Sequence, residues 1–217
     1  LVHLMLKKVL LLLLLALAWP LSAAENSFQA RAEAYLATLT SRDMFAGAVL
    51  VATNGQTVFA KGYGLASREH SVVNTPETKF RLGSVSKQFT AMCILLLQAD
   101  RRLNVHDKIS SHLEICPESW SGITIAHLLN HTSGIPSFTE FEDNLGFERN
   151  PTTVKATVQR FIDRPLEFTP GTKFAYSNSG YVLLGFIIER TSGGTYERFL
   201  EDRILRPLGL RNTGYDH

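Results

Sequence analysis

The chain has few of the residues and motifs that mark several common kinds of site. It holds two cysteines in 217 residues, Cys93 and Cys116, and neither has a partner at a spacing typical of a metal site. It has no glycine-rich phosphate-binding loop and no Gly-x-Ser-x-Gly motif, so neither a nucleotide site nor the α/β-hydrolase arrangement is favoured. With 45% hydrophobic and 19% charged residues, the composition indicates a globular fold, and no cofactor is expected.

Long apolar runs are confined to the N-terminus. Lys7 and Lys8 precede the apolar residues 9–19, and small residues follow as far as Ala24. This order is typical of a secretory signal peptide, which predicts cleavage after Ala24 and a secreted or periplasmic protein. An uncleaved membrane anchor is the alternative, but the run is shorter than the roughly 20 residues of a spanning helix. Membrane contact is expected only through the signal peptide before cleavage.

The charge balance argues against a nucleic-acid partner. The whole chain carries a formal net charge of +2, with 22 basic and 20 acidic residues. Removal of Lys7 and Lys8 with the signal peptide leaves 20 basic residues against 20 acidic ones, a net charge of 0. No basic patch is evident, so binding to nucleic acid is not expected.

The sequence after the signal peptide predicts a helix and then a β-hairpin. Residues 25–40 have the apolar spacing of an amphipathic helix, and residues 46–63 form two β-rich runs around Asn54-Gly55. Residues 49–51 are apolar at successive positions, which predicts a strand covered on both faces. Because a hairpin alone is marginally stable in water, other elements are expected to pack on it.

The stretch FRLGSVSKQFT, residues 80–90, opens a helix that is predicted to end near Asp100. The helix is apolar nearly all round, which indicates burial. A disulfide is permitted in an exported protein, but for Cys93, inside this helix, a buried free thiol is favoured. If the helix begins near Ser84, the Ser84 hydroxyl and the Lys87 amine meet at its N-terminus, where the dipole favours negative charge.

Ser84 and Lys87 are therefore a candidate nucleophile and base. A lysine acts as a base only when it is partly neutral, which burial favours, and serine activated by lysine is an accepted nucleophile variant. The alternative is an N-cap serine beside a solvated lysine. A Ser-x-x-Lys match of this kind is expected by chance in a chain of this length, so its meaning depends on the rest of the sequence.

The second half of the chain reads as short helices separated by turns. Residues 137–150 are a long polar loop of the kind that borders a site. The predicted helices are residues 123–130, residues 151–162 with Thr152 or Thr153 as cap, residues 180–190 closed by Gly193-Gly194, and residues 195–205 stopped by Pro207.

Two further groups of polar residues are candidates for chemistry. Tyr176 and Asn178 follow a Pro-Gly turn; a phenol near a cation can transfer protons, and an amide can orient a lysine and a substrate. The alternative is that Tyr176 and Asn178 lie in an ordinary turn without a chemical role.

His127 and His131 have the spacing of a zinc helix, but Leu128 replaces the glutamate of that motif and no third ligand is evident. Structural histidines are favoured over a metal site.

Four blocks of the sequence carry a family resemblance. They are FRLGSVSKQFT at 80–90, ITIAHLLNHTSGIP at 123–136, PGTKFAYSNSGYVLLGFII at 170–188 and PLGLRNT at 207–213. Taken together, they resemble the serine β-lactamase and penicillin-binding protein family, closest to the class C branch with its esterases and D-amino-acid peptidases. The resemblance implies an α+β fold with a helical domain beside an antiparallel sheet, over a domain of residues 25–217.

The resemblance also implies roles for the candidate residues. Ser84 is expected to be the acylated nucleophile, with its backbone N–H as an oxyanion donor, and Lys87 the base. Tyr176 is expected to be the second proton-transfer group and Asn178 the amide-binding residue. The implied substrates are β-lactams, peptidoglycan stem peptides and small esters.

One departure from the family is the lack of a Lys- or His-x-Gly strand motif after Tyr176. The family's C-terminal strands also have no counterpart, so we expect the chain to be the N-terminal portion of a longer protein. The competing hypothesis is a non-catalytic fragment or a peptidoglycan-binding remnant. A metal hydrolase that uses His127 and His131 ranks last.

Overall fold

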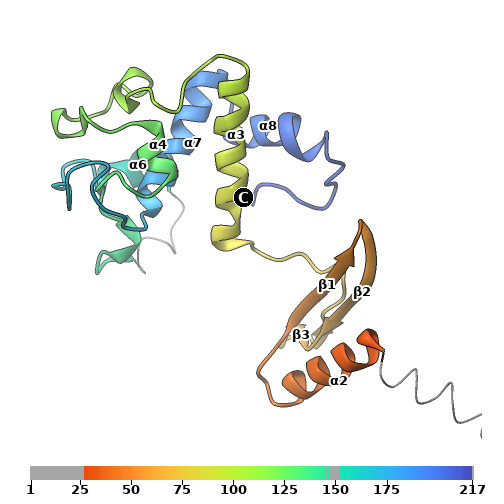
Figure 1. Ribbon diagram of the computed structural model, residues 1–217. Helices are drawn as coiled ribbons and strands as arrows, with labels where there is room; N and C mark the ends of the chain where they lie inside the picture. Colours follow the sequence, from red (N-terminus) through yellow and green to blue (C-terminus); the bar gives the residue numbers. More distant parts are fainter. Residues whose placement is uncertain (1–26, 145, 147–151, 217) are drawn as a thin grey trace, which may run out of the picture. The chain divides into compact units, whose positions relative to one another are not determined.

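The computed structural model describes residues 27–144, 146 and 152–216. The predicted signal peptide lies outside these residues, as does part of the predicted loop at 137–150. The chain forms two compact units, Leu1–Phe80 and Arg81–His217, each of which is described by itself (Figure 1). The first contains small antiparallel sheets and a helix, and the second is helical, so the predicted α+β class is confirmed.

In the first unit, strands β1 and β2 form the predicted hairpin. They pair antiparallel with Thr53 opposite Gln56, and Asn54 and Gly55 have φ values of 51° and 75°, as in a type I′ turn. A second two-stranded sheet follows directly in the chain. The elements are α2 (Phe28–Ser41), β1 (Gly47–Thr53), β2 (Gln56–Tyr63), β3 (Leu65–Ser67) and β4 (Val72–Val73).

Helix α2 packs against β2 and covers one face of the hairpin. The ring of Phe28 meets that of Phe59 edge-on at 6.4 Å, and Phe59 is buried. Leu50 is 66% exposed, because neighbouring residues of a strand point to opposite faces. The expectation of a strand covered on both faces is therefore wrong for the described part of this unit.

The second unit is built around α3 and α7. Helix α3 packs against α7 and α8, while α4 and α6 pack against α7 (Figure 1). In the described residues, no helix has the length and apolar character needed to cross a membrane. The elements are η1 (Gly83–Ser86), α3 (Lys87–Ala99), η2 (Ile109–Ser111), η3 (Glu118–Trp120), α4 (Ile125–Leu129), η4 (Phe138–Glu140), α6 (Val154–Gln159), α7 (Asn178–Ser192), α8 (Tyr196–Leu200) and the π-helical turn η5 (Glu201–Leu205).

The core of this unit joins the facing sides of α3 and α7. The fully buried aliphatic residues of the two helices are Ile94, Leu97, Leu183, Leu184, Ile187 and Ile188. Full burial of an aliphatic side chain contributes about 1.5–3 kcal/mol, so the contact between these residues fixes α3 and α7 against each other. Trp120 and Phe161 stack beside this contact at 6.2 Å between ring centroids.

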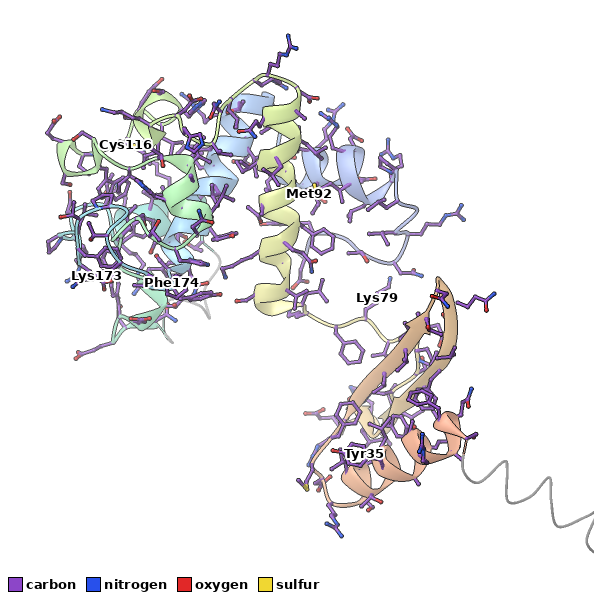
Figure 2. All side chains as sticks on the ribbon, in the orientation of Figure 1. Tyr35, Lys79, Met92, Cys116, Lys173 and Phe174 are labelled. Carbon is purple, nitrogen blue, oxygen red and sulfur yellow. The ribbon has the colours of Figure 1, made fainter. Side chains whose placement is uncertain are left out.

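The outer side of α3 is not covered. Met92, labelled in Figure 2, is 48% exposed and Leu95 is 46% exposed, so the expectation of a helix buried all round is wrong for the described residues. Cys93 lies on the buried side as a free thiol, as predicted, and burial raises its pKa to about 12. Cys116 is also free, and burial raises its pKa to about 11. Both cysteines are therefore thiols rather than reactive thiolates at neutral pH.

The predicted helix ends are largely confirmed by capping contacts. Thr153 begins α6 by accepting a hydrogen bond from the Ala156 N–H, and Thr195 caps α8 in the same way. The predicted helix at 151–162 is shorter, and that at 195–205 divides into α8 and η5. Gly193 ends α7 in the left-handed conformation, as the sequence predicts.

Gly134 lies in the turn that joins α4 to the loop before η4. Its φ is 76°, and a Cβ at this position would lie 2.3 Å from the carbonyl oxygen of Phe168. Its own carbonyl oxygen accepts a hydrogen bond from the Glu167 N–H. The turn therefore depends on the absence of a side chain.

We expect Gly134→Ala to destabilise the protein by about 2–5 kcal/mol. The left-handed backbone costs an alanine roughly 1–2 kcal/mol, and overlap with the Phe168 carbonyl costs about 1–3 kcal/mol more. Gly193→Ala is the matched control, because Gly193 has a φ of 75° with no atom within 4 Å of an added Cβ. Urea unfolding followed by circular dichroism measures both losses, and equal losses would contradict the steric argument.

Candidate active site

Ser84 lies in the 3₁₀ turn η1, which leads directly into α3. Lys87 is the first residue of α3, so the predicted helix start near Ser84 is a tighter turn in which residues i and i+3 lie one above the other. Lys87 Nζ donates a hydrogen bond to Ser84 Oγ over 3.1 Å. The structure therefore brings the hydroxyl and the amine together as the sequence predicts.

Tyr176 and Asn178 reach the same place from the segment that enters α7. Tyr176 Oη lies 2.7 Å from Ser84 Oγ, and Lys87 Nζ donates a hydrogen bond to Asn178 Oδ1 over 2.7 Å. Between them, Ser177 caps α7, so the chain turns here and presents the two side chains to α3. All four predicted site residues therefore meet, although 92 positions separate Ser84 from Tyr176.

The Lys87 side chain lies between aromatic rings. Its Nζ is 4.7 Å from the ring centroid of Tyr176 and 5.4 Å from that of Tyr181, distances at which a cation and a ring attract. Burial alone would raise the pKa of the Tyr176 phenol. Its hydrogen-bonding contacts with Lys87 and Ser84, together with the Lys87 charge, outweigh burial and hold that pKa below its usual value. The Tyr176 proton is therefore easier to remove than that of a free phenol.

Two hydroxyl groups from the loop before α6 hold Asn178. Asn178 Nδ2 donates to Thr139 Oγ1 over 2.8 Å, and the Asn178 backbone N–H donates to Ser137 Oγ over 3.0 Å. The two hydroxyls also lie within hydrogen-bonding distance of each other, 3.0 Å. Because Nδ2 is engaged by Thr139, the amide oxygen Oδ1 faces Lys87.

Ser179 fixes the same loop to α7. It is fully buried, donates a hydrogen bond to the carbonyl oxygen of Pro136 and accepts one from the Phe138 N–H. The sequence predicts that this loop borders the site, and its described part does. The hydroxyl partners of Asn178 were missed, because serine and threonine in a loop follow no periodic pattern that would single them out.

His127 and His131 make structural hydrogen bonds. His127 Nδ1 accepts the Thr124 N–H, which completes a capping box at the start of α4, and His131 Nδ1 accepts the Ser177 N–H. Within the described ranges, no three residues of the metal-binding types gather where an ion could be held. Both imidazoles therefore have a role in positioning backbone segments.

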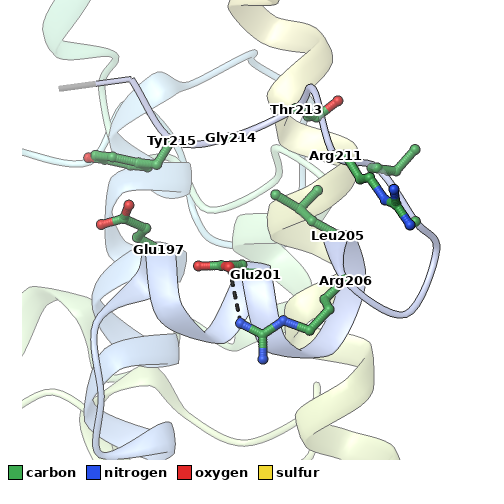
Figure 3. Close-up of a pocket in the computed structure, with 10 residues that line it drawn as sticks. Glu197, Glu201, Leu205, Arg206, Arg211, Thr213, Gly214 and Tyr215 are labelled. Atoms are coloured by element: carbon green, nitrogen blue, oxygen red, sulfur yellow. Dashed lines mark hydrogen bonds and ion pairs between the residues drawn. The ribbon is translucent and has the colours of Figure 1, made fainter.

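A pocket of about 460 Å³ lies between α8, η5 and the segment that follows η5 (Figure 3). Glu201 and Arg206 form an ion pair at its wall. None of the four predicted site residues lines this pocket. Within the second unit, Ser84 and Tyr176 are exposed.

Known proteins match nearly all of the part of the chain that the structure describes. The profile of the Beta-lactamase family matches residues 28–217. Penicillin-binding protein 4* of Bacillus subtilis is 36% identical over 183 residues, which cover 81% of this chain and 39% of that protein.

Solved structures of penicillin-binding proteins and related enzymes are also similar to this chain. The crystal structure of a penicillin-binding protein from Bacillus halodurans has a TM-score of 0.74 at 30% identity, and the match covers 83% of this chain and 56% of that one. The D-amino acid amidase from Ochrobactrum anthropi has a TM-score of 0.69 at 26% identity, over 82% of this chain and 49% of that one.

The chain spans about 34–39% of the length of the curated relatives that it matches. Within that span, the family profile covers both compact units and includes Ser84, Lys87, Tyr176 and Asn178. On the combined evidence of profile, relatives and fold, the chain belongs to the β-lactamase family, together with penicillin-binding proteins.

Proposed function

We propose that the protein is an exported serine hydrolase that opens an amide or ester bond through an acyl-enzyme on Ser84. The observation that carries the proposal is the position of Ser84 Oγ, which lies 3.1 Å from Lys87 Nζ and 2.7 Å from Tyr176 Oη. A nucleophilic hydroxyl needs a proton acceptor within this reach, and here two candidate groups are present.

Acylation follows from this geometry. Ser84 Oγ attacks the carbonyl carbon of the substrate, and its proton passes to the pair formed by Lys87 and Tyr176. The same pair returns a proton to the leaving nitrogen or oxygen as the bond to the carbonyl carbon breaks. The backbone N–H of Ser84 stabilises the negative charge that develops on the carbonyl oxygen. The product is an ester between Ser84 and the acyl group.

Hydrolysis of this ester completes the cycle. A water molecule gives a proton to the Lys87–Tyr176 pair as it attacks the acyl carbon, and Ser84 Oγ takes up a proton as it leaves. Asn178 Oδ1 accepts the hydrogen bond from Lys87 and so orients the amine, and the family resemblance assigns binding of the substrate amide to the same residue. The acid is released and Ser84 is restored.

The substrate classes that we propose are β-lactams, D-amino-acid peptides such as peptidoglycan stem peptides, and small esters. The penicillin-binding relatives support the first class, and the structural neighbour described as a D-amino acid amidase supports the second, because a D-amino-acid peptide also contains an amide of a D-amino acid. All three present a carbonyl carbon to the same nucleophile. Which class is preferred depends on the groups around that carbon.

We expect a fluorescent penicillin or a fluorophosphonate to label Ser84 covalently. Ser84→Ala removes the nucleophile and should abolish labelling. Lys87→Ala should slow labelling by about 10²–10⁴-fold, the usual contribution of an acid–base group. Ser86→Ala is the matched control, since Ser86 lies in the same turn and its side chain makes no capping hydrogen bond. Mass spectrometry of the labelled peptide identifies the modified serine.

A folded sample that neither reagent labels would contradict the proposal. Circular dichroism and cooperative thermal unfolding establish that the sample is folded. Cooperative folding without labelling would instead favour the non-catalytic alternative, a peptidoglycan-binding remnant, which sedimentation with purified peptidoglycan would test.

We expect Tyr176→Phe to slow labelling by about 10²–10⁴-fold, because the variant keeps the ring and loses the proton-transferring hydroxyl. Since the pKa of Tyr176 is lowered, the wild-type rate should rise with pH and level off below about pH 10, the usual value for tyrosine. That rise should disappear in the variant.

Tyr181→Phe is the control for this measurement. Tyr181 also faces Lys87, but its hydroxyl donates to the Leu129 carbonyl oxygen and burial raises its pKa. This variant should lose stability and keep its pH profile. An unchanged profile in Tyr176→Phe would exclude the phenol as a proton-transfer group.

We expect export with cleavage after Ala24. The proposal rests on Lys7, Lys8 and the apolar residues 9–19. Expression of the whole chain in a bacterium, followed by N-terminal sequencing of the exported product, should give Glu25 as the first residue. Leu13→Arg interrupts the apolar run and should leave the product uncleaved in the cytoplasm. Retention of the wild type with an intact N-terminus would contradict the prediction.

A further inference from the structure

His131 contacts the segment around Tyr176 at three points. Its carbonyl oxygen accepts a hydrogen bond from the Ala175 N–H over 3.0 Å, and its Nδ1 accepts one from the Ser177 N–H over 3.1 Å. Its ring lies 4.5 Å from the ring of Tyr176. His131 therefore holds the backbone on both sides of Tyr176 and supports the phenol ring itself.

Other rings hold His131 in place. Tyr181 stacks on it at 5.1 Å and an interplanar angle of 29°, and the hydroxyl of Tyr181 is tied to the Leu129 carbonyl oxygen. Phe174, labelled in Figure 2, approaches it edge-on at 5.9 Å. The backbone of His131 has a φ of 57°, an uncommon conformation for a residue other than glycine. A strained conformation that packing maintains is typical of functional sites.

The hydrogen bond from Ser177 determines the protonation state of the ring. Nδ1 accepts a backbone N–H, so it carries a lone pair, and the proton of the neutral ring is on Nε2. A proton on Nδ1 would face the Ser177 N–H, break this bond and release the residue between Tyr176 and Asn178. The arrangement of the site therefore requires a neutral His131.

The surrounding groups favour that neutral state. Two tyrosines face the ring, Tyr176 from the segment before α7 and Tyr181 from α7, and the charge of Lys87 at the start of α3 also acts on it. Burial, and then the positive charge of Lys87, lower the pKa of His131. Because the folded pKa lies below the unfolded one, the neutral ring contributes stability above about pH 6.5, and this is lost as the pH falls through the lowered pKa.

We propose that His131 is a positioning residue for Tyr176 and that its protonation ends acylation of Ser84 on the acid side. The inference rests on the proposed function, because the affected step is acylation. When His131 is neutral, the Tyr176 hydroxyl stays 2.7 Å from Ser84 Oγ. When His131 is protonated, the segment at 175–177 is released and the phenol leaves this position.

Two substitutions separate the contributions of His131. His131→Asn keeps an acceptor for the Ser177 N–H and tolerates the left-handed backbone, but it has no titrating group. His131→Phe keeps the ring contact with Tyr176 and loses the acceptor. His127→Asn is the matched control, since His127 Nδ1 also accepts a backbone N–H, from Thr124.

The measurement is the rate of Ser84 labelling by a fluorescent penicillin at saturating and limiting concentrations, between about pH 5 and 9. We expect the wild-type saturating rate to fall below about pH 6.5 more steeply than the titration of Tyr176 alone would produce, and His131→Asn to lack this additional fall while it keeps the part due to Tyr176. His131→Phe should be slower at every pH by about tenfold to a hundredfold, as for a misplaced catalytic group, with half-saturation unchanged. His127→Asn should keep the wild-type profile and lose only stability.

The proposal would be overturned if the labelling rate of His131→Asn fell at low pH as steeply as that of the wild type. It would also be overturned if His131→Phe kept the saturating rate of the wild type. A second readout does not depend on labelling. In the ¹⁵N spectrum of the wild type, His131 should show the proton on Nε2, and its titration should shift the Tyr176 ring signals. If the chain is never labelled, the proposed function fails, while an absent shift of Tyr176 overturns the role of His131 separately.

Discussion

The site depends on the position of the Lys87 ammonium group. It donates hydrogen bonds to Ser84 Oγ and Asn178 Oδ1, and it lies over the rings of Tyr176 and Tyr181. These contacts join the start of α3 to the segment that enters α7. A single lysine thereby helps to set the distance between the proposed nucleophile, Ser84, and its proposed proton-transfer partner, Tyr176, and its charge also lowers the pKa of Tyr176.

That position is maintained by apolar packing farther along the two helices. The buried side of α3 meets α7 through fully buried residues such as Ile94, Leu97 and Leu184, so the N-terminal ends of the two helices cannot shift independently. At those ends, polar contacts take over from apolar ones. Ser179 ties α7 to the loop, and that loop supplies Thr139 to Asn178. The core thus gives the site its rigidity, and the loop gives Asn178 its orientation.

Much of this arrangement could be predicted from local sequence signals. Asn54-Gly55 predicts the hairpin turn and Gly193 the end of α7. That Ser84, Lys87, Tyr176 and Asn178 meet follows only from the family resemblance that the motif blocks carry. The exposure of Met92 could not be predicted, because apolar periodicity shows which residues can be buried and not which sides a neighbour covers. The contacts of Thr139 with Asn178 and of His131 with Ser177 could not be predicted either. Their partners lie 39 and 46 positions apart in the sequence, and no periodic pattern links them.

His131 illustrates why such contacts matter for the chemistry. A second positive charge beside Lys87 would compete for the same aromatic faces and would oppose the proton transfer that we propose for Tyr176. The Ser177 N–H prevents this by occupying Nδ1, the ring atom that a proton would need on that side. Ser177, whose side chain caps α7, therefore also acts on the charge of the site through its backbone N–H. Helix capping, loop position and protonation state are set by the same few atoms, which ties the chemistry of the site to local folding at 175–178.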